Sequence, residues 1–405
     1  MARLVPLLVL GYGTVGRGVL ASLRARASSS PGVDVRVCIV GTRGLRAAAP
    51  ARAHRARAAV ALACLDHRAG VVAEVMGGTS AARCAMRAAG VRTHTPLVTA
   101  NKALLACYGT EACRRAVLAD AAVAGGLPIV AVAHRCTPAA RMANAAGVLN
   151  STANWVLTCM CRYCLPLRRA LLEAYARGYA EADCACDVDG SDAAQKLAVL
   201  GSWAPGVHVR PRSLYAEGVR RVRSPDCACA RALGLDVKLL SLVSHAGTVR
   251  GQVRPFMASA RCPAACCDGV TNAVFLDGEH TGGMWLYGRG AGMRPTAAAV
   301  CSDVNAAARS AASGELAPLP APRRLSASAR MRGKYYLRAG FDAPQDCRYA
   351  LSRCMRIPTV TARLVHASGR AACVAVLEAA HERNMRALVA GDAAVRSARF
   401  LMVVL

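Results

Sequence analysis

The sequence predicts an α/β protein made of a doubly wound parallel sheet, an α+β domain after it, and a small α+β module near the end of the chain. Its 405 residues are enough for two or three domains with hydrophobic cores. In the first third, short apolar runs alternate with helical patterns, as βαβ units do. Past residue 135 the pattern changes, because long helical stretches precede strand-like runs.

Five apolar runs predict the strands of the first sheet. Residues 5–10 form the first strand, and a glycine-rich turn at 11–16 leads into a helix over 15–26. In residues 33–40, Val, Ile and Cys alternate with polar side chains, which predicts the second strand. Three more strands are expected, separated by Ala-rich helices, over residues 71–76, 91–99 and 127–132.

The second part of the chain predicts helices over 165–179 and 192–200, and strands over 251–257 and 273–276. A stretch rich in Pro, Ala, Arg and Ser over 313–332 then predicts a linker.

The tail predicts a βαββα order, with strands over 335–338, 360–365 and 372–377. Such an order is typical of a small α+β regulatory module. We therefore expect three domains, with these boundaries: 1–135, completed by about 296–312; 136–295; and 333–405.

The chain is strongly basic, with 52 Lys and Arg residues against 24 Asp and Glu residues and a formal net charge of +28. Such a charge is typical of proteins that bind nucleic acids or anionic membranes. However, only four of the basic residues are lysine, and Ala is abundant while Ile and Phe are rare. This imbalance is typical of GC-rich coding, which raises the charge without a partner. Since no helix-turn-helix, RRM or zinc-finger pattern is present, we expect no nucleic acid and no membrane partner.

The 20 cysteines are too sparse for a disulfide scaffold and predict reduced thiols that serve as small apolar side chains. Cys161 and Cys164 form a lone CxxC motif, for which a structural zinc site is the less favoured alternative. The longest weakly polar stretch, over 121–133, is too short to span a bilayer as a helix. The first apolar run is shorter than a signal-peptide core. We therefore expect a cytoplasmic protein.

A glycine fingerprint follows the first predicted strand and opens a helix, which is the context of a Rossmann-type dinucleotide-binding domain. In it, Gly11 allows the tight turn, Gly13 lets the backbone approach a pyrophosphate, and Gly16 lets helix and strand pack closely. The helix N-terminus supplies amide donors to the phosphates. After the second strand the sequence offers Arg43 and no acidic residue, which favours NADP(H), with NAD(H) as the alternative.

Two of the four lysines lie in segments whose polar residues are typical of a site. Lys102 follows a predicted strand end, at the sheet edge where α/β proteins bind ligands. Lys196 follows Asp192 by four residues, so the two are neighbours on one helical face. Five of the acidic residues fall between Glu181 and Asp192. Where nearly every other cation is Arg, these lysines predict proton donation, which a guanidinium cannot provide; a surface ion pair is the alternative.

These segments make the sequence resemble the homoserine dehydrogenase family. The similarity extends over about the first 310 residues, in the family's order. The matching segments are GYGTVGRGV (11–19), EVMGG (74–78), VTANKALLA (98–106), AVAGGLPI (122–129), GVLNSTANWVLT (147–158), GYAEADCACDVDGSDAAQKLAVL (178–200), EGV (217–219) and YGRGAGMRPTAAAVCSDV (287–304). The last 70 or so residues resemble an ACT domain.

The resemblance implies that the chain reduces L-aspartate 4-semialdehyde to L-homoserine with NAD(P)H, in the biosynthesis of threonine and methionine. It implies that Lys196 donates the proton to the aldehyde oxygen and that Lys102 and Asp192 complete the catalytic set. The substrate is expected to contact Glu181, Asp187 and Asp192. Besides Arg43 and the fingerprint glycines, the expected cofactor contacts are Thr14, Val15, Thr79, Lys102, Gly178, Glu181 and Gly290.

The resemblance also implies a Na⁺ site, made by the Asp120 carboxylate and the carbonyls of Val123, Gly125 and Leu127. Asp120 stands where the family has Glu, so this ligand is shorter by one methylene. The segments 137–142, 150–154 and 343–346 also depart from the family's pattern. The last of these leaves open whether the tail mediates threonine inhibition.

The sequence thus favours an NADP-preferring enzyme with a small-molecule substrate, assembled as a homodimer or homotetramer. A catalytically weakened homologue that acts as a binding or scaffold protein is the alternative, because the composition has drifted and the loop over 150–154 is altered.

Overall fold

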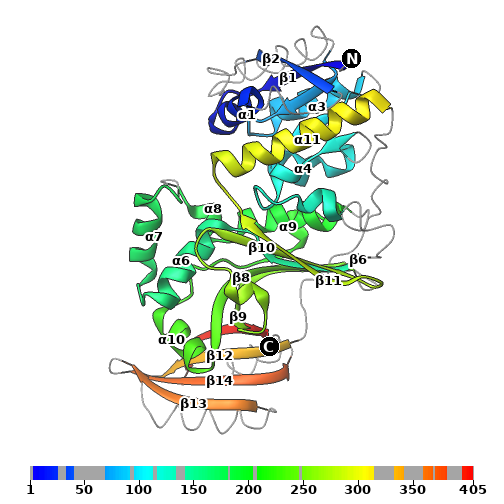
Figure 1. The fold of residues 1–405 in the computed structure, drawn as a ribbon. Helices are drawn as coiled ribbons and strands as arrows, with labels where there is room; N and C mark the ends of the chain where they lie inside the picture. Colours follow the sequence, from blue (N-terminus) through cyan, green and yellow to red (C-terminus); the bar gives the residue numbers. More distant parts are fainter. Residues whose placement is uncertain are drawn as a thin grey trace.

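The computed structural model describes residues 3–25, 33–40, 69–91, 95–112, 116–133, 142–180, 183–203, 208–245, 249–313, 333–341, 359–367, 370–380 and 395–404. These residues form three tiers (Figure 1). A first sheet with its helices lies at one end, a second sheet in the middle, and the tail strands at the other end.

The first tier is a five-stranded parallel sheet with the strand order β2-β1-β3-β4-β5. β1 pairs with both β2 and β3, so the carboxyl ends of β1 and β3 flank the crevice in which doubly wound sheets bind ligands. The strand bounds are Arg3–Leu10 (β1), Val33–Val40 (β2), Val71–Glu74 (β3), Leu97–Thr99 (β4) and Val117–Leu118 (β5).

Helices cover both faces of this sheet. Side chains of a strand point alternately to opposite faces. Leu7 and Val9 of β1 therefore share a core with Val304, whereas Leu8 lies in the core that contains Met86. The first face is covered by α1 (Thr14–Ala25) and α11 (Met293–Ser313), and the second by α3 (Ser80–Val91) and α4 (Lys102–Ala112).

The second tier is the first half of a ten-stranded sheet, in the order β11-β10-β6-β8-β9, with β7 beside β9. Its strands are β6 (Met142–Val148), β7 (Tyr215–Ala216), β8 (Leu235–Ser244), β9 (Arg250–Ser259), β10 (Thr271–Gly278) and β11 (Gly282–Arg289). The helices of this tier are α6 (Ser151–Arg162), α7 (Leu167–Ala176), α8 (Ala185–Val188), α9 (Ser191–Trp203) and α10 (Ser224–Ala232). Three short 3₁₀ turns lie at Asp120–Ala122, Pro211–Ser213 and Pro263–Cys266.

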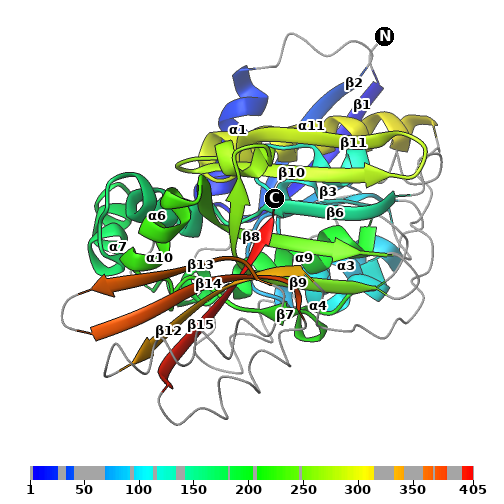
Figure 2. The same ribbon diagram turned by 90° about the horizontal axis from the view of Figure 1, so that it is seen from below.

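The tail continues this sheet in the order β15-β12-β14-β13. Its strands pair antiparallel with one another, and β15 pairs in parallel with β9. Figure 2 shows the four strands extending from the second tier. Their bounds are Gly333–Phe341 (β12), Thr359–Ala367 (β13), Arg370–Ala380 (β14) and Val395–Val404 (β15).

Three of the expected elements are corrected. The strand expected over 91–99 is only β4, because α3 continues to Val91. Residues 127–132 form no strand; a helical turn begins after Pro128, whose carbonyl accepts the N–H of Val132 at 3.0 Å. The fifth strand is β5, and the tail has a fourth strand, β15, that the βαββα pattern omitted.

Of the linker predicted over 313–332, Ser313 is the last residue of α11, and residues 314–332 lie outside the described residues. The segment over 134–141 also lies outside them. No described helix combines the length and apolarity that a bilayer span requires.

Candidate active site

The glycine fingerprint forms a tight turn between β1 and α1. Gly11 has a φ of +116°, and a Cβ there would lie 2.7 Å from the carbonyl oxygen of Val75. A Cβ on Gly16 would lie 2.1 Å from the carbonyl oxygen of Gly11, so only glycine permits this helix to start so close to the strand. In contrast, a Cβ on Gly13 would meet nothing within 4 Å. The space in front of Gly13 and the exposed Thr14 is therefore open to a ligand at the N-terminus of α1.

The opposite wall of this crevice is the turn after β3, where Gly77 and Gly78 both have positive φ and also face open space. Thr79 follows, directly before α3, and its carbonyl accepts the N–H of Arg83 at 2.9 Å. Two glycine turns with free space therefore face the crevice between β1 and β3, as a bound dinucleotide requires.

A chain of hydrogen bonds connects the end of β3 to the start of α4. Glu74 is fully buried, and its carboxylate accepts the N–H of Met76 at 2.9 Å and the hydroxyl of Thr99 at 2.7 Å. Thr99 Oγ1 in turn accepts the N–H of Asn101 at 3.0 Å. Burial raises the pKa of Glu74, although its hydrogen bonds, that with Thr99 first among them, oppose the shift.

Asn101 then fixes the first turn of α4. Its Oδ1 accepts the N–H of Leu104 at 3.0 Å, which caps the helix, and its Nδ2 donates to the carbonyl of Gly78 at 2.6 Å. Lys102 is consequently held at the N-terminus of α4, beside the glycine turn of the crevice.

α4 of the first tier packs against α9 of the second, and this contact brings the two predicted lysines together. Lys102 Nζ lies 3.1 Å from Asp192 Oδ1, and Lys196 Nζ lies 2.8 Å from Asp192 Oδ2. Lys196 also donates to the carbonyl of Leu149 at 2.9 Å. Burial alone would raise the pKa of Asp192, but Lys196 and Lys102 outweigh it and hold the pKa at about 2. Asp192 is therefore ionised near neutral pH.

Asn150 connects the carboxylates of this cluster. As the N-cap of α6, it accepts the N–H of Ala153 at 2.7 Å through Oδ1. Its Nδ2 lies 2.7 Å from Asp187 Oδ1 and 2.7 Å from Asp192 Oδ2. Burial, with a smaller contribution from the charge of Asp192, raises the pKa of Asp187, and the bond from Asn150 opposes this.

The loop between α8 and α9 holds the two aspartates at this position. Gly190 has a φ of +86°, and a Cβ on Gly218 would lie 1.9 Å from the carbonyl oxygen of Val188. The EGV segment must therefore carry glycine for α8 to approach it. Gly178 (φ +69°) faces open space, and the hydroxyl of Thr152 fixes its turn by donating to the carbonyl of Tyr179 at 2.8 Å.

Gly290, expected to contact the cofactor, packs against the loop over 120–127. A Cβ on Gly125 would lie 2.4 Å from the carbonyl oxygen of Gly290. A Cβ on Gly290 itself would lie 2.0 Å from Cγ of Asn272. The glycine is thus required for packing where α11 begins.

The residues expected to bind Na⁺ all belong to this loop. Asp120 Oδ1 accepts the N–H of Ala131 at 2.8 Å, and the N–H of Asp120 donates to Asp303 Oδ2 at 2.9 Å. Burial and the neighbouring Asp120 raise the pKa of Asp303 to about 8. Val123, Gly125 and Leu127 are buried beside them. Within the described ranges, no group of three or more His, Cys, Asp or Glu side chains is placed to hold a metal ion.

Two of the expected site residues, Arg43 and Glu181, lie outside the described residues.

Comparison with known proteins identifies the family. The model of the homoserine dehydrogenase family matches residues 128–304, and that of the homoserine dehydrogenase NAD binding domain matches residues 11–131. The homoserine dehydrogenase of Synechocystis sp. is 36% identical over 311 residues, which are 73% of this chain and 71% of the relative. The chain belongs to the homoserine dehydrogenase family.

Other homoserine dehydrogenases agree with this assignment. The one from Neisseria gonorrhoeae is 35% identical over 309 residues, which are 73% of this chain and 70% of the relative. The crystal structure of a homoserine dehydrogenase from Thiobacillus denitrificans superimposes with a TM-score of 0.85 at 28% identity, covering 100% of this chain and 99% of that one. The expected fold class, family and activity as an NAD(P)-dependent oxidoreductase are thereby confirmed.

Two polar residues contact the site although the sequence assigned them no role. Glu74 is the only acid in the short strand β3, and a lone carboxylate in an apolar strand is a signal of a buried partner. Asn150 precedes a helix, where an N-cap is expected. Helix capping accounts for the hydrogen bond that its Oδ1 accepts. Its Nδ2 donates to two aspartates from distant segments of the chain, and the local sequence pattern cannot indicate these contacts.

Proposed function

We propose that Lys102, Asp192 and Lys196 are the catalytic residues with which this chain reduces L-aspartate 4-semialdehyde to L-homoserine. The observation that carries this proposal is the contact of both lysines with the two oxygens of one buried carboxylate. Two ammonium groups are thus fixed at the crevice beside the glycine turns. A surface ion pair would not require burial of Asp192, whose side chain is only 10% exposed.

The open space at Gly13, Gly77 and Gly78 fits a dinucleotide, since no Cβ at these positions would meet a protein atom. Gly13 and Thr14, together with the amides of α1, would hold its phosphates, and Lys102 and Thr79 would face its nicotinamide end. When bound, the reduced nicotinamide supplies a hydride for the aldehyde carbon. We infer a preference for NADP(H) over NAD(H), supported by Arg43 and by the lack of an acid in residues 40–44.

In this mechanism the Lys196 ammonium donates a proton to the aldehyde oxygen as negative charge develops on it. Asp192 and the carbonyl of Leu149 hold Lys196 Nζ in one position. The proton donor would therefore be oriented before the substrate binds. Glu181 and Asp187 would bind the ammonium group of the substrate. Lys102 would neutralise the negative charge on Oδ1 of Asp192, the carboxylate oxygen that Lys196 does not contact.

Substitution of Lys196 tests this role. Because the proton donor is lost, Lys196→Ala should lower kcat by at least about 100-fold, while the Kd for NADPH in fluorescence titration stays within twofold. Lys196→Arg keeps the cation beside Asp192 but not the proton donor, and should be nearly as slow. A loss of NADPH binding with turnover retained would refute the assignment, and full activity of the arginine variant would refute proton donation.

The alternative of a scaffold protein predicts no turnover. The intact cluster of lysines and carboxylates supports the enzyme. Brisk oxidation of NADPH by aspartate semialdehyde would eliminate the scaffold function, and the same assay with NADH measures the cofactor preference.

We propose that Na⁺ binds weakly at the loop over 120–127. Asp120 is one methylene shorter than Glu, and its Oδ1 already accepts the N–H of Ala131. Replacing 100 mM NaCl by KCl should therefore change kcat less than twofold, and Asp120→Glu should raise the sodium dependence. Strong activation by millimolar Na⁺ in the parent chain would contradict this.

We propose that the chain forms a homodimer or homotetramer. β11 is an edge of the second sheet among the described strands, and it exposes Met284 and Tyr287. Exposed apolar side chains on an edge strand favour pairing with a second copy.

We propose that the tail is an ACT-like module. Its strand order β15-β12-β14-β13, with antiparallel neighbours, is that of a split βαβ arrangement. Whether it responds to threonine is decided by the same NADPH assay with and without threonine.

A further inference from the structure

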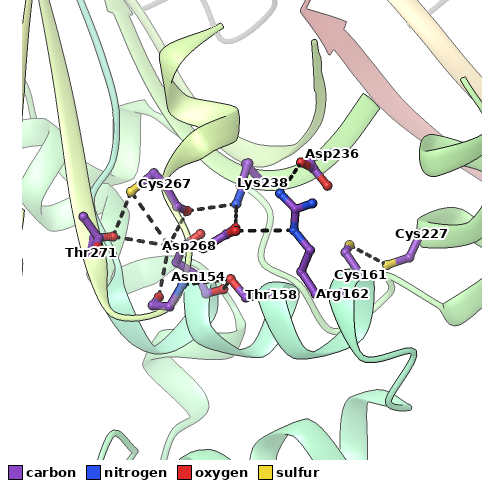
Figure 3. A network of polar contacts seen from close by, with 11 residues as sticks. Asn154, Thr158, Cys161, Arg162, Cys227, Asp236, Lys238, Cys267, Asp268 and Thr271 are labelled. Carbon is purple, nitrogen blue, oxygen red and sulfur yellow. Dashed lines mark hydrogen bonds and ion pairs between the residues drawn. The ribbon is translucent and has the colours of Figure 1, made fainter. Parts of the chain in front are cut away.

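Cys161 and Cys227 lie side by side in the second tier, although they are 66 residues apart in the chain. Cys161 is in the last turn of α6 and Cys227 is in α10, and their sulfurs are 2.9 Å apart (Figure 3). Both are buried, at 7% and 2% exposure. The sequence pairs Cys161 with Cys164 in a CxxC motif, but the fold gives it a different neighbour.

The ends of the two helices are already fixed in this arrangement. Arg231 of α10 donates a hydrogen bond to the carbonyl of Cys161. Arg162, the last residue of α6, binds Asp236 at 3.0 Å and Asp268 at 3.3 Å, and Asp268 also binds the buried Lys238 at 2.7 Å (Figure 3). Because a disulfide bond is about 2.05 Å long, the two sulfurs, 2.9 Å apart, need to approach by less than one ångström.

A third cysteine gives access from solvent. Cys164 follows α6, is exposed, and accepts a hydrogen bond from the Arg231 guanidinium at 3.3 Å. An exposed thiol beside a cation is the environment in which cysteines react with external oxidants. The hydrogen bond with Cys227 lowers the pKa of the Cys161 thiol despite burial. The same bond, with burial, raises the pKa of Cys227.

We propose that Cys161 and Cys227 form a reversible disulfide, with Cys164 as the thiol that admits the oxidant, a small-molecule disulfide RSSR. The Cys164 thiolate attacks RSSR, bonds to one sulfur and expels RS⁻. Cys161 then attacks Sγ of Cys164 and expels the second RS⁻. Finally Cys227 attacks Sγ of Cys161 and releases Cys164 as a thiol. Overall, Cys161 and Cys227 lose two protons and two electrons, and RSSR becomes two RSH.

The disulfide would join the end of α6 to α10 and close a loop of 66 residues. Such a crosslink removes entropy from the unfolded chain, so Tm should rise by about 5 °C. The residues of the proposed active site lie at the other end of α6, where Asn150 caps it. kcat should therefore be the same in the oxidised and reduced protein.

Peptide mapping tests the proposal on the full chain. The reduced protein is incubated with oxidised glutathione, blocked with an alkylating agent, digested without reductant and analysed by mass spectrometry. We expect a crosslinked Cys161–Cys227 peptide that dithiothreitol cleaves. Cys227→Ser should stop the reaction at a Cys161–Cys164 disulfide, and Cys164→Ser should slow it at least tenfold without changing the product. Cys229→Ser, on the same helix, is the matched control and should behave as the parent.

Two results would overturn the proposal. One is a parent protein in which Cys161 and Cys227 remain alkylated as free thiols after oxidation. The other is a crosslink that involves other cysteines in place of these two. Thermal unfolding gives an independent readout: the rise in Tm on oxidation should disappear in Cys227→Ser and persist in Cys229→Ser. An equal rise in both variants would show that the stabilising bond lies elsewhere.

Discussion

Asp192 contacts both proposed catalytic lysines and Asn150 through two carboxylate oxygens, so its charge has consequences for stability as well as for activity. Its pKa is about 2 in the folded chain, below the ordinary 3.8. A depressed pKa stabilises the fold at pH values above the unfolded value, and this contribution is lost as the pH falls through the folded value. The shift corresponds to about 2 kcal/mol near neutral pH.

We therefore expect Asp192→Asn to lower the free energy of unfolding by about 2 kcal/mol at pH 7. About half of that difference should vanish at pH 3, where the carboxylate of the unfolded chain is mostly protonated. Urea unfolding of both proteins at the two pH values measures the effect. Glu173→Gln, which alters an exposed ion pair with Arg177, is the control and should change little. A difference that does not depend on pH would show that the lysines do not interact with the charge of Asp192.

Thr99 is a second residue whose effect can be isolated, because it joins Glu74 to the turn that carries Lys102. Thr99→Val keeps the shape but leaves the Glu74 carboxylate and the N–H of Asn101 without this partner. We expect kcat to fall about tenfold, which corresponds to ~1.4 kcal/mol at the transition state, and Tm to fall by several degrees. Thr99→Ser keeps the hydroxyl and should retain both. If the valine and serine variants share the same kcat, the hydrogen bond does not position Lys102.

The rarity of lysine identified Lys102 and Lys196, and the structure brings them within reach of one carboxylate. The same rarity applies to Lys238, which is buried and bound to the carbonyl of Cys267 and to Asp268. A compact ammonium can fill that space, so survival of lysine also marks buried structural sites. Composition alone cannot separate the two cases, because they differ only in what the fold places next to the amine.

At the scale of elements, the glycines of the turn between β1 and α1 have two different roles. Gly16 is required for packing of the turn, and Gly13 leaves space for the cofactor. Gly16→Ala would place Cβ 2.1 Å from the carbonyl of Gly11, so we expect a fall in Tm of several degrees or a loss of folded protein. Gly13→Ala meets no protein atom and should leave Tm within about 2 °C. It should raise the Kd for NADPH at least tenfold, because the methyl group enters the space for the pyrophosphate. Unaltered NADPH binding by Gly13→Ala would place the cofactor elsewhere.

Most elements could be predicted from hydrophobic periodicity, and the exceptions have physical causes. Residues 127–132 are apolar enough for a strand, but Pro128 starts a helical turn on their N-terminal side. β5 has two residues, too few to show a period. β15 is defined by its pairing with β12 and β9, which local sequence does not contain.

At the scale of the molecule, β11 is where we expect a second copy to bind. Trp285 and Tyr287 stack at 6.0 Å on one face of this strand, and Phe275 of β10 lies 4.8 Å from Trp285. We predict that the double variant Trp285→Ser/Tyr287→Ser halves the molar mass measured by light scattering. The exposed Tyr163 directly follows α6 and the exposed Tyr175 belongs to α7, so neither is part of β11, and their serine variants should keep the parent mass. A monomeric parent would refute the proposed assembly, and an unchanged mass of the double variant would place the interface elsewhere.

The position of α11 in the chain has a consequence for synthesis on the ribosome. α11 covers the face of the first sheet formed by Val5, Leu7 and Val9. It ends only at Ser313, about 180 residues after Ala133, which is the last described residue before the second tier begins. At ~5–20 residues per second, translation of that interval takes roughly 10–35 s. During that time the part of this apolar face that α11 covers in the folded chain is exposed to the surroundings, since only α1 is already present on it. Chaperones that bind nascent chains would therefore be expected to act on this protein before residue 313 emerges.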